Sequence, residues 1–245
     1  MALKESEAIV LRTYPMGEAD RLVSFLSRSA GRLRGVAAGA KRPKSRFGST
    51  LELLSHIKIW YYERETRELV RISQGELIES FLAAQSDYAR GLSVALVSEV
   101  AEVVLPEKEP SDPVFRLILT AARSLAGGAD IQVVLSYFAL WIAKLSGWLP
   151  DLEHCSKCGR ELKDEVAYEN YEGALHCAKC HLKGREVGAS ARMLASRMTR
   201  EKLQALLEHE GSGADARTIY NFALDIVERQ ADRKLSTRKL LEEAP

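Results

Sequence analysis

Hydrophobic and polar positions alternate with a period of two through much of the first 80 residues. In the clearest case Ile57, Ile59 and Tyr61 fall on one side of the chain and the residues between them fall on the other. Turn signals separate short runs of β-branched and aromatic residues, which predict strands at 9–13, 22–28, 32–38, 53–62 and 68–72. Five strands in so short a segment favour a small barrel, for which the OB-fold is the usual five-stranded form.

From Ser80 onwards the apolar positions recur every three to four residues, which predicts helices. These helical patterns cover residues 92–104, 114–121, 131–145, 203–207 and 219–226. The pattern over 131–145 is apolar nearly all round and therefore indicates a buried helix. The predicted fold class is α+β, with a five-stranded OB-fold barrel followed by an all-helical domain.

A polar segment over 151–186 interrupts the helical patterns and holds all four cysteines. They form two Cys-x-x-Cys pairs, with eighteen residues between the inner cysteines. Two residues between thiolates let one tight turn present both sulfurs to a single ion, and this pairing is typical of zinc ribbons. The sequence therefore predicts one structural zinc ion in a four-cysteine insertion, with the ligands Cys155, Cys158, Cys177 and Cys180.

Other interpretations of the cysteines are two disulfides, a redox pair or four unrelated thiols. Three histidines adjoin the cysteines, and His154, His176 or His181 could replace one ligand. We favour surface or supporting roles for them. Four thiolates would close the coordination shell, whereas a catalytic zinc keeps one position open. We divide the chain into an OB-fold domain (1–80), a first helical part (81–150), the zinc module (151–186) and a second helical part (187–245).

Composition is ordinary for a globular protein: 245 residues, 46% hydrophobic and 28% charged. The net charge of +1 excludes a protein that binds nucleic acid through bulk charge. The charge is nevertheless unevenly placed, because the first 80 residues carry 14 basic and 10 acidic side chains. Between Asp20 and Glu52 there is no acidic residue, but there are eight basic ones: Arg21, Arg28, Arg32, Arg34, Lys41, Arg42, Lys44 and Arg46.

A basic barrel face beside a basic loop suits contacts to phosphates. We expect DNA contacts from six of these side chains, namely Arg32, Arg34, Lys41, Arg42, Lys44 and Arg46. Arg12 and Phe47 are weaker candidates, Phe47 as an exposed aromatic at the loop tip. Trp60 and Tyr62, with Lys58, could form a second stacking platform. The alternative is a solvated basic loop, with both aromatics packed against the helical domain.

Catalytic motifs are missing from the sequence. There is no phosphate-binding Gly-x-x-x-x-Gly-Lys-[Ser/Thr] loop, no Gly-x-Ser-x-Gly elbow and no His-Glu-x-x-His pair. We also find neither a signal-peptide pattern nor a membrane-spanning apolar run. These patterns indicate a protein that is not an enzyme, that binds no membrane and that is cytoplasmic.

Several segments taken together resemble the bacterial RecO family of recombination mediators over essentially the whole length. The most specific are the Gly-Glu-x-Asp turn at 17–20 and the Gly-Ala-Lys-Arg-Pro-Lys-Ser loop at 39–45, and the resemblance extends to 8–12, 31–33 and 235–241. The resemblance implies the OB-fold, the helical domain and the zinc module. It also implies binding of single- and double-stranded DNA without sequence preference, and annealing of complementary strands.

The same resemblance implies partners: RecR, the C-terminal tail of the single-strand-binding protein and, indirectly, the recombinase RecA. Two other classes of function stay open from the residues alone. One is a zinc-ribbon adaptor whose basic loop binds an acidic protein partner rather than DNA. The other is a nucleic-acid enzyme, which the lack of a carboxylate cluster for a catalytic metal disfavours.

Overall fold

The structure is a computed structural model that describes residues 2–64, 66–163, 167–169, 173–180, 184–208 and 213–243. Its contacts divide the chain into two compact units. The first unit is Met1–Gly127 together with Leu235–Pro245, and the second is Gly128–Lys234. The predicted four-part division stays a prediction, because compactness alone does not show which parts fold independently.

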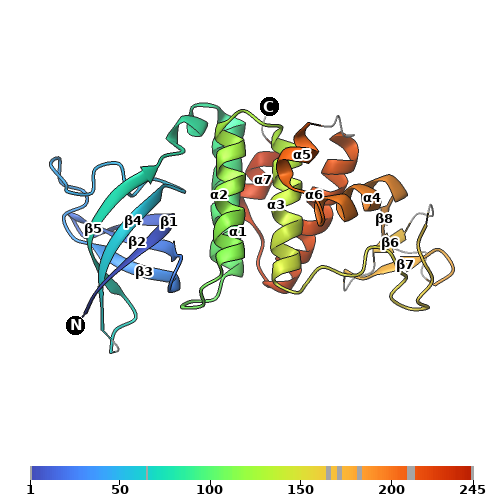
Figure 1. Cartoon of the computed structure of the whole chain (residues 1–245), viewed down its shortest axis with the longest axis horizontal. Coiled ribbons are helices and arrows are strands. Elements are labelled where there is room, and N and C mark those ends of the chain that lie inside the picture. The colour runs from blue at the N-terminus through green and yellow to red at the C-terminus, as the bar shows by residue number, and fades with distance from the viewer. Residues whose placement is uncertain are drawn as a thin grey trace. The chain divides into compact units, whose positions relative to one another are not determined.

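Five strands close the predicted barrel in the first unit (Figure 1). They are β1 (Ala2–Met16), β2 (Asp20–Ser27), β3 (Gly31–Ala37), β4 (His56–Glu63) and β5 (Val70–Glu79). Their order around the barrel is β1-β2-β3-β5-β4, and β3 and β5 pair in parallel. This order is that of an OB-fold, so the predicted fold class of the first domain is confirmed.

The long first strand closes the barrel because it pairs with two neighbours. Residues 2–9 pair with β4 and residues 8–16 pair with β2, with a bulge between Val10 and Arg12. A bulge bends a strand and increases its twist, which lets one strand serve two sheets. Where β3 pairs with β5, a Cβ on Gly35 would lie 2.7 Å from Val70 Cγ2, so only glycine allows these two strands to approach each other this closely.

The barrel core consists of buried aliphatic and aromatic side chains from all five strands and from the loop before β4. Ile57, Ile59 and Tyr61 are buried as the alternation predicted, and Phe25 meets Tyr61 edge to face with ring centroids 5.9 Å apart. The predicted strand at 53–62 begins later than expected, at His56. Leu54 lies in a turn instead, and its side chain is buried.

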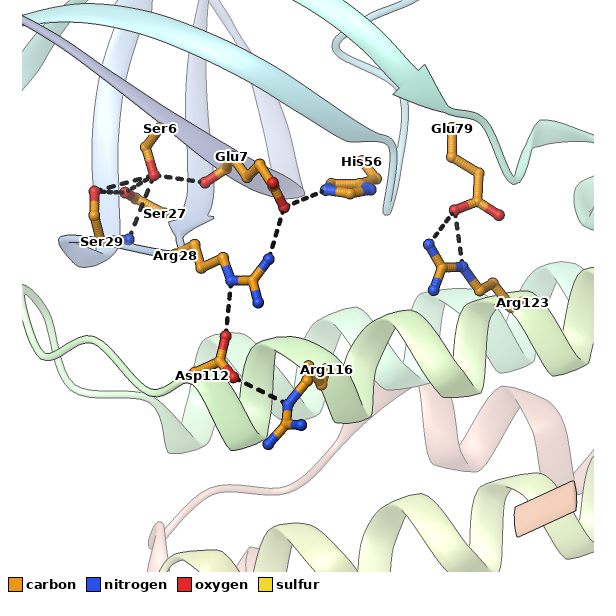
Figure 2. Close-up of polar contacts among 10 residues, drawn as sticks. All are labelled: Ser6, Glu7, Ser27, Arg28, Ser29, His56, Glu79, Asp112, Arg116 and Arg123. Carbon is orange, nitrogen blue, oxygen red and sulfur yellow. Dashed lines mark hydrogen bonds and ion pairs between the residues drawn. The ribbon is translucent and has the colours of Figure 1, made fainter. Parts of the chain in front are cut away.

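The first unit continues with a short 3-10 helix, η1 (Leu82–Ser86), and two predicted helices, α1 (Tyr88–Val104) and α2 (Asp112–Ala126). Figure 2 shows how α2 meets the barrel: Arg28 lies between Glu7 and Asp112, at 3.0 and 2.7 Å. His56 lies 3.2 Å from Glu7 and meets the Phe115 ring edge to face. Arg28, one of the eight basic residues, therefore serves this interface.

The C-terminal helix α7 (Ser236–Glu242) also belongs to the first unit and contacts α1. The carboxylate of the buried Glu99 accepts hydrogen bonds from the Ser236 N–H at 2.9 Å, the Ser236 hydroxyl at 2.7 Å and the Thr237 N–H at 2.8 Å. Burial would raise the pKa of Glu99, but the hydrogen bonds from Thr237 and Ser236 outweigh it and lower the pKa below its ordinary 4.5.

The second unit contains the predicted helices α3 (Ile131–Leu145), α5 (Leu203–Leu207) and α6 (Gly213–Gln230), and an additional helix α4 (Ala189–Met198). Most of α3 is buried, as its apolar pattern predicted, and it packs against α6. Three short strands form a sheet in the order β7-β6-β8, namely β6 (Ala167–Glu169), β7 (Leu175–Cys177) and β8 (Arg185–Val187). Among the described residues, no helix combines the length and apolar character needed to cross a bilayer.

Candidate metal centre and candidate nucleic-acid interface

The four cysteine sulfurs converge in the second unit, where they all lie within 4.8 Å of one another. The Sγ atoms of Cys158 and Cys177 are 3.9 Å apart, and none of the four cysteines forms a disulfide. Four sulfurs about 2.3 Å from a tetrahedral ion would be about 3.8 Å from one another. The thiols therefore stand close to the arrangement that one tetrahedral metal ion needs.

Two turns present these sulfurs. In the first, the Gly159 N–H donates to the Cys155 carbonyl at 2.9 Å, and Gly159 has φ +69°, a left-handed conformation that glycine adopts readily. In the second, the Cys180 N–H donates to the Cys177 carbonyl at 2.9 Å at the end of β7. Cys155 and Cys177 are buried, while Cys158 and Cys180 reach the surface.

The pKa values of Cys155 and Cys180 are shifted in opposite directions. Burial would raise the pKa of Cys155, but hydrogen bonds from the backbone of Cys177, Cys158 and Lys157 outweigh burial and lower the pKa to about 5. Hydrogen bonding to Cys158 and then Cys177 raises the pKa of Cys180 to about 12. Four thiolates at this spacing repel one another, so the cluster suits a cation that would offset their charge.

Among the described residues, no histidine joins the four cysteines in the group that could hold a metal ion. The ring of His154 is exposed and lies 3.0 Å from the Asp151 carboxylate, and His176 lies on β7. His181 lies outside the described residues. The arrangement offers four sulfur ligands, which leaves no open coordination position for a substrate.

Two buried charged side chains, which the sequence analysis missed, fix the cysteine module to the helices of the second unit. Arg192 on α4 is 6% exposed and donates to the carbonyls of Leu162 and Lys163. Glu169 on β6 is 4% exposed and accepts from Arg229 on α6 at 2.7 Å. An isolated charged residue in a sequence looks the same whether it is buried or solvated, so the sequence carried no signal for these contacts.

The basic loop consists of residues 41–48 of the first unit, and four of its side chains are exposed: Lys41, Arg42, Lys44 and Arg46. None of the four has an ion-pair partner among the described residues. The loop is anchored at its start, where the Lys41 N–H donates to the Ala19 carbonyl at 2.9 Å. Its positive charge is therefore available to an anionic ligand.

Phe47 does not form the exposed tip that the sequence suggested. Its side chain is 1% exposed and belongs to the barrel core, with the Arg46 guanidinium 5.0 Å from its ring centroid. The expectation of an exposed stacking aromatic at this position is wrong. The loop folds back over the barrel, because a large apolar ring gains more from burial than from exposure.

Arg32 and Arg34 are alternate residues of β3 and therefore share one face of it, but an acidic residue lies beside both. Glu107 is 2.9 Å from Arg34 Nε and 3.7 Å from an Arg32 nitrogen, and Arg32 Nε also donates to the Leu105 carbonyl at 2.8 Å. Part of their charge is neutralised within the first unit. Their role as DNA contacts stays a prediction, with less support than the loop has.

The second predicted platform, around Trp60, is engaged in contacts on the barrel wall. Glu5 lies 2.7 Å from the Trp60 indole nitrogen and 2.6 Å from Lys58 Nζ, which itself lies over the Trp60 ring. Arg12, in contrast, is exposed on β1 and places its guanidinium 5.2 Å from the centroid of the Tyr14 ring.

Comparisons with known proteins cover almost the whole chain. Residues 1–81 match the family described as "Recombination protein O N terminal", and residues 85–239 match "Recombination protein O C terminal". The chain is 40% identical to "DNA repair protein RecO" of Koribacter versatilis over 241 residues, which are 98% of both proteins. It is 38% identical to the Nocardioides protein of the same name over 189 residues, 74% of this chain and 76% of that protein. The chain therefore belongs to the RecO family of DNA repair proteins.

Proposed function

We propose that the chain is a non-enzymatic recombination mediator that binds single- and double-stranded DNA without sequence preference and anneals complementary strands. The observation that carries this proposal is the group of four exposed basic side chains on residues 41–48, which lack ion-pair partners among the described residues. Family membership supports it, because the relatives are named DNA repair proteins.

Annealing requires two polyanions to approach each other. The basic loop reduces their repulsion by replacing counterions on the phosphates, and it leaves the base edges available for pairing. No bond is made or broken in this step, so the protein needs neither a nucleophile nor a bound nucleotide. Lys41, Arg42, Lys44 and Arg46 contact phosphates in this proposal, with Arg32 and Arg34 contributing from the adjacent face of β3.

Three further proposals follow from the family. The chain helps to load RecA onto strands coated by single-strand-binding protein, it binds RecR and the C-terminal tail of that protein, and it acts in the bacterial cytoplasm at the nucleoid. One zinc ion, held by the four cysteines, has a structural role. The soft sulfur donors and the tetrahedral spacing of the thiols support zinc.

Salt dependence tests the proposal for the loop. If the six basic residues contact phosphates, the logarithm of the affinity for a single-stranded oligonucleotide falls with log salt with a slope of about −4. Replacing Lys41, Arg42, Lys44 and Arg46 by Ala lowers the affinity for all sequences alike and reduces the slope by about 3. Fluorescence anisotropy at four salt concentrations measures both quantities.

A matched control removes the same number of charges from exposed positions elsewhere, at Arg116, Lys202, Arg217 and Lys239. This control retains the slope of the wild type if the loop is the binding surface. A second assay follows annealing of complementary strands coated by single-strand-binding protein, without added nucleotide. Acceleration that the loop variant loses supports the mediator. Complexes with an acidic protein, together with no affinity for bare DNA, favour the adaptor instead.

A further inference from the structure

The barrel carries an exposed aromatic beside the basic loop, on the outward face of β1. Tyr14 is 40% exposed and Met16 is 42% exposed, whereas the outward-facing residues nearer the other end of the same sheet, Ile9 and Leu26, are buried. Tyr14 pairs with Leu22 on β2, which pairs in turn with Val36 on β3. Residues directly opposite one another share a face, so Tyr14 begins a half-buried apolar row across three strands.

Arg12 stands one row from Tyr14 on the same face. Its guanidinium lies 5.2 Å from the centroid of the Tyr14 ring, a cation–π distance that holds the ring in place. Arg12 is exposed and has no carboxylate partner among the described residues. The pair therefore offers an aromatic surface and an available positive charge side by side.

Hydrogen bonds attach this face to the basic loop. Two of these bonds run from Lys41 to the turn between β1 and β2. The Lys41 N–H donates to the Ala19 carbonyl at 2.9 Å, and Lys41 Nζ donates to the Gly17 carbonyl at 3.3 Å. The Asp20 carboxylate accepts from the Gly39 N–H at 2.8 Å, so part of its charge is offset by the backbone. The remaining acidic residue of the turn is the exposed Glu18. Five exposed basic residues stand against it, namely Arg12 and the four of the loop.

Other aromatics near the loop lack the exposure that stacking requires. Phe47 is in the barrel core, and Trp60 is engaged by Glu5 and Lys58. Among the described residues, the exposed large aromatic side chains are Tyr14 and Tyr88, and Tyr88 lies at the start of α1. Tyr14 is thus the aromatic that the first unit presents beside the basic loop.

We propose that Tyr14, held by Arg12, stacks on an unpaired nucleobase of single-stranded DNA whose phosphates lie on the basic loop. This inference rests on the proposed function and adds the group that distinguishes single strands from duplex. A ring can stack only on a base that has left its neighbours, and every base has a face suitable for stacking. The loop charges bind both forms of DNA, whereas Tyr14 contributes to single strands alone.

The test compares three variants, Tyr14→Ala, Tyr14→Phe and Tyr88→Ala, with the wild type. Their dissociation constants are measured for a single-stranded and a duplex oligonucleotide of equal length at several salt concentrations. Loss of one stacked base weakens single-strand binding by about 5- to 150-fold. Tyr14→Ala should show this loss, with unchanged duplex affinity and an unchanged salt slope. Tyr14→Phe and Tyr88→Ala should bind single strands as the wild type does.

Arg12→Gln tests whether Arg12 holds the ring, because it removes the cation that lies over Tyr14. Its affinity for single strands should fall by less than that of Tyr14→Ala, and its duplex affinity should stay at the wild-type value. Wild-type affinity of Tyr14→Ala for single strands would overturn the inference, and so would an equal loss for single strands and duplex. Both results leave the proposed function intact. A wild-type protein without salt-dependent affinity for either DNA would overturn the proposed function together with this inference.

Discussion

At the scale of single residues, Phe47 connects the basic loop to the barrel core. Its ring is buried among core residues, and its carbonyl accepts from the Thr50 hydroxyl at 2.6 Å. Phe47→Ala should therefore lower the free energy of unfolding by about 3–5 kcal/mol, as expected for a large-to-small change in a core. Urea unfolding followed by circular dichroism measures the effect.

The adjacent Arg46→Ala serves as the control for Phe47→Ala, because Arg46 is exposed and its removal leaves no cavity. Its unfolding free energy should stay within about 0.5 kcal/mol of the wild type. A Phe47→Ala variant of wild-type stability that no longer binds single-stranded DNA would contradict the structural role and restore the stacking role.

The charges of the basic loop were predictable, whereas the orientation of its aromatic was not. A run without acidic residues already indicates an exposed basic surface, and Lys41, Arg42, Lys44 and Arg46 are exposed. A loop has no hydrophobic period, so sequence gives no direction for Phe47. The neutralisation of Arg34 by Glu107 was equally hidden, because those residues meet only in the folded chain.

At the scale of elements, the cysteine module shows which patterns a sequence carries well. Its ligands are fixed by local spacing, and the structure brings all four sulfurs together as that spacing predicted. Its strands β6, β7 and β8 have three residues each, too few to show alternation, and the sequence analysis did not predict them. The long strands and helices, which show several periods, were predicted apart from their ends, with the exception of the ten-residue helix α4 (Ala189–Met198).

Metal removal tests whether a zinc ion on these cysteines keeps the cysteine module folded. Cys155→Ser, or a chelator, should release one zinc ion per chain and unfold the module, because metal-binding free energy in such a polar segment is folding free energy. Bound zinc is measured by atomic emission, and loss of structure by protease resistance of residues 151–187. Ser156→Ala, at an exposed position between the ligands, is the control and should retain both.

The affinity of the remaining folded barrel for single-stranded DNA should change little on metal removal, because the proposed contacts lie in the other compact unit. Full retention of stability combined with loss of DNA binding would contradict this assignment. That result would place the cysteine module in the DNA interface instead.

At the scale of the whole molecule, the first compact unit joins both ends of the sequence. Leu235 is 3% exposed, and the segment that follows it is held by the carboxylate of Glu99 on α1. The helical patterns of the sequence analysis end at residue 226, before this tail. Seven residues of helix are too short for a clear apolar stripe, so a sequence pattern could not assign the tail to the N-terminal unit.

Glu99→Gln tests the attachment of the C-terminal segment to α1, since it retains the shape of the side chain and removes its charge. We expect a loss of about 1–3 kcal/mol in the free energy of unfolding at pH 7, because hydrogen bonds to an ionised acceptor are the stronger ones. The folded pKa of Glu99 lies below its ordinary 4.5, so its contribution is present above that value and is lost as pH falls through the folded pKa. The difference between wild type and variant in urea unfolding should therefore shrink below pH 4.5. Glu102→Gln on the same helix should show neither effect, because Glu102 is half-buried and has no hydrogen bond to the described part of the tail. An equal loss at pH 7 and below pH 4.5 would show that Glu99 acts through packing rather than charge.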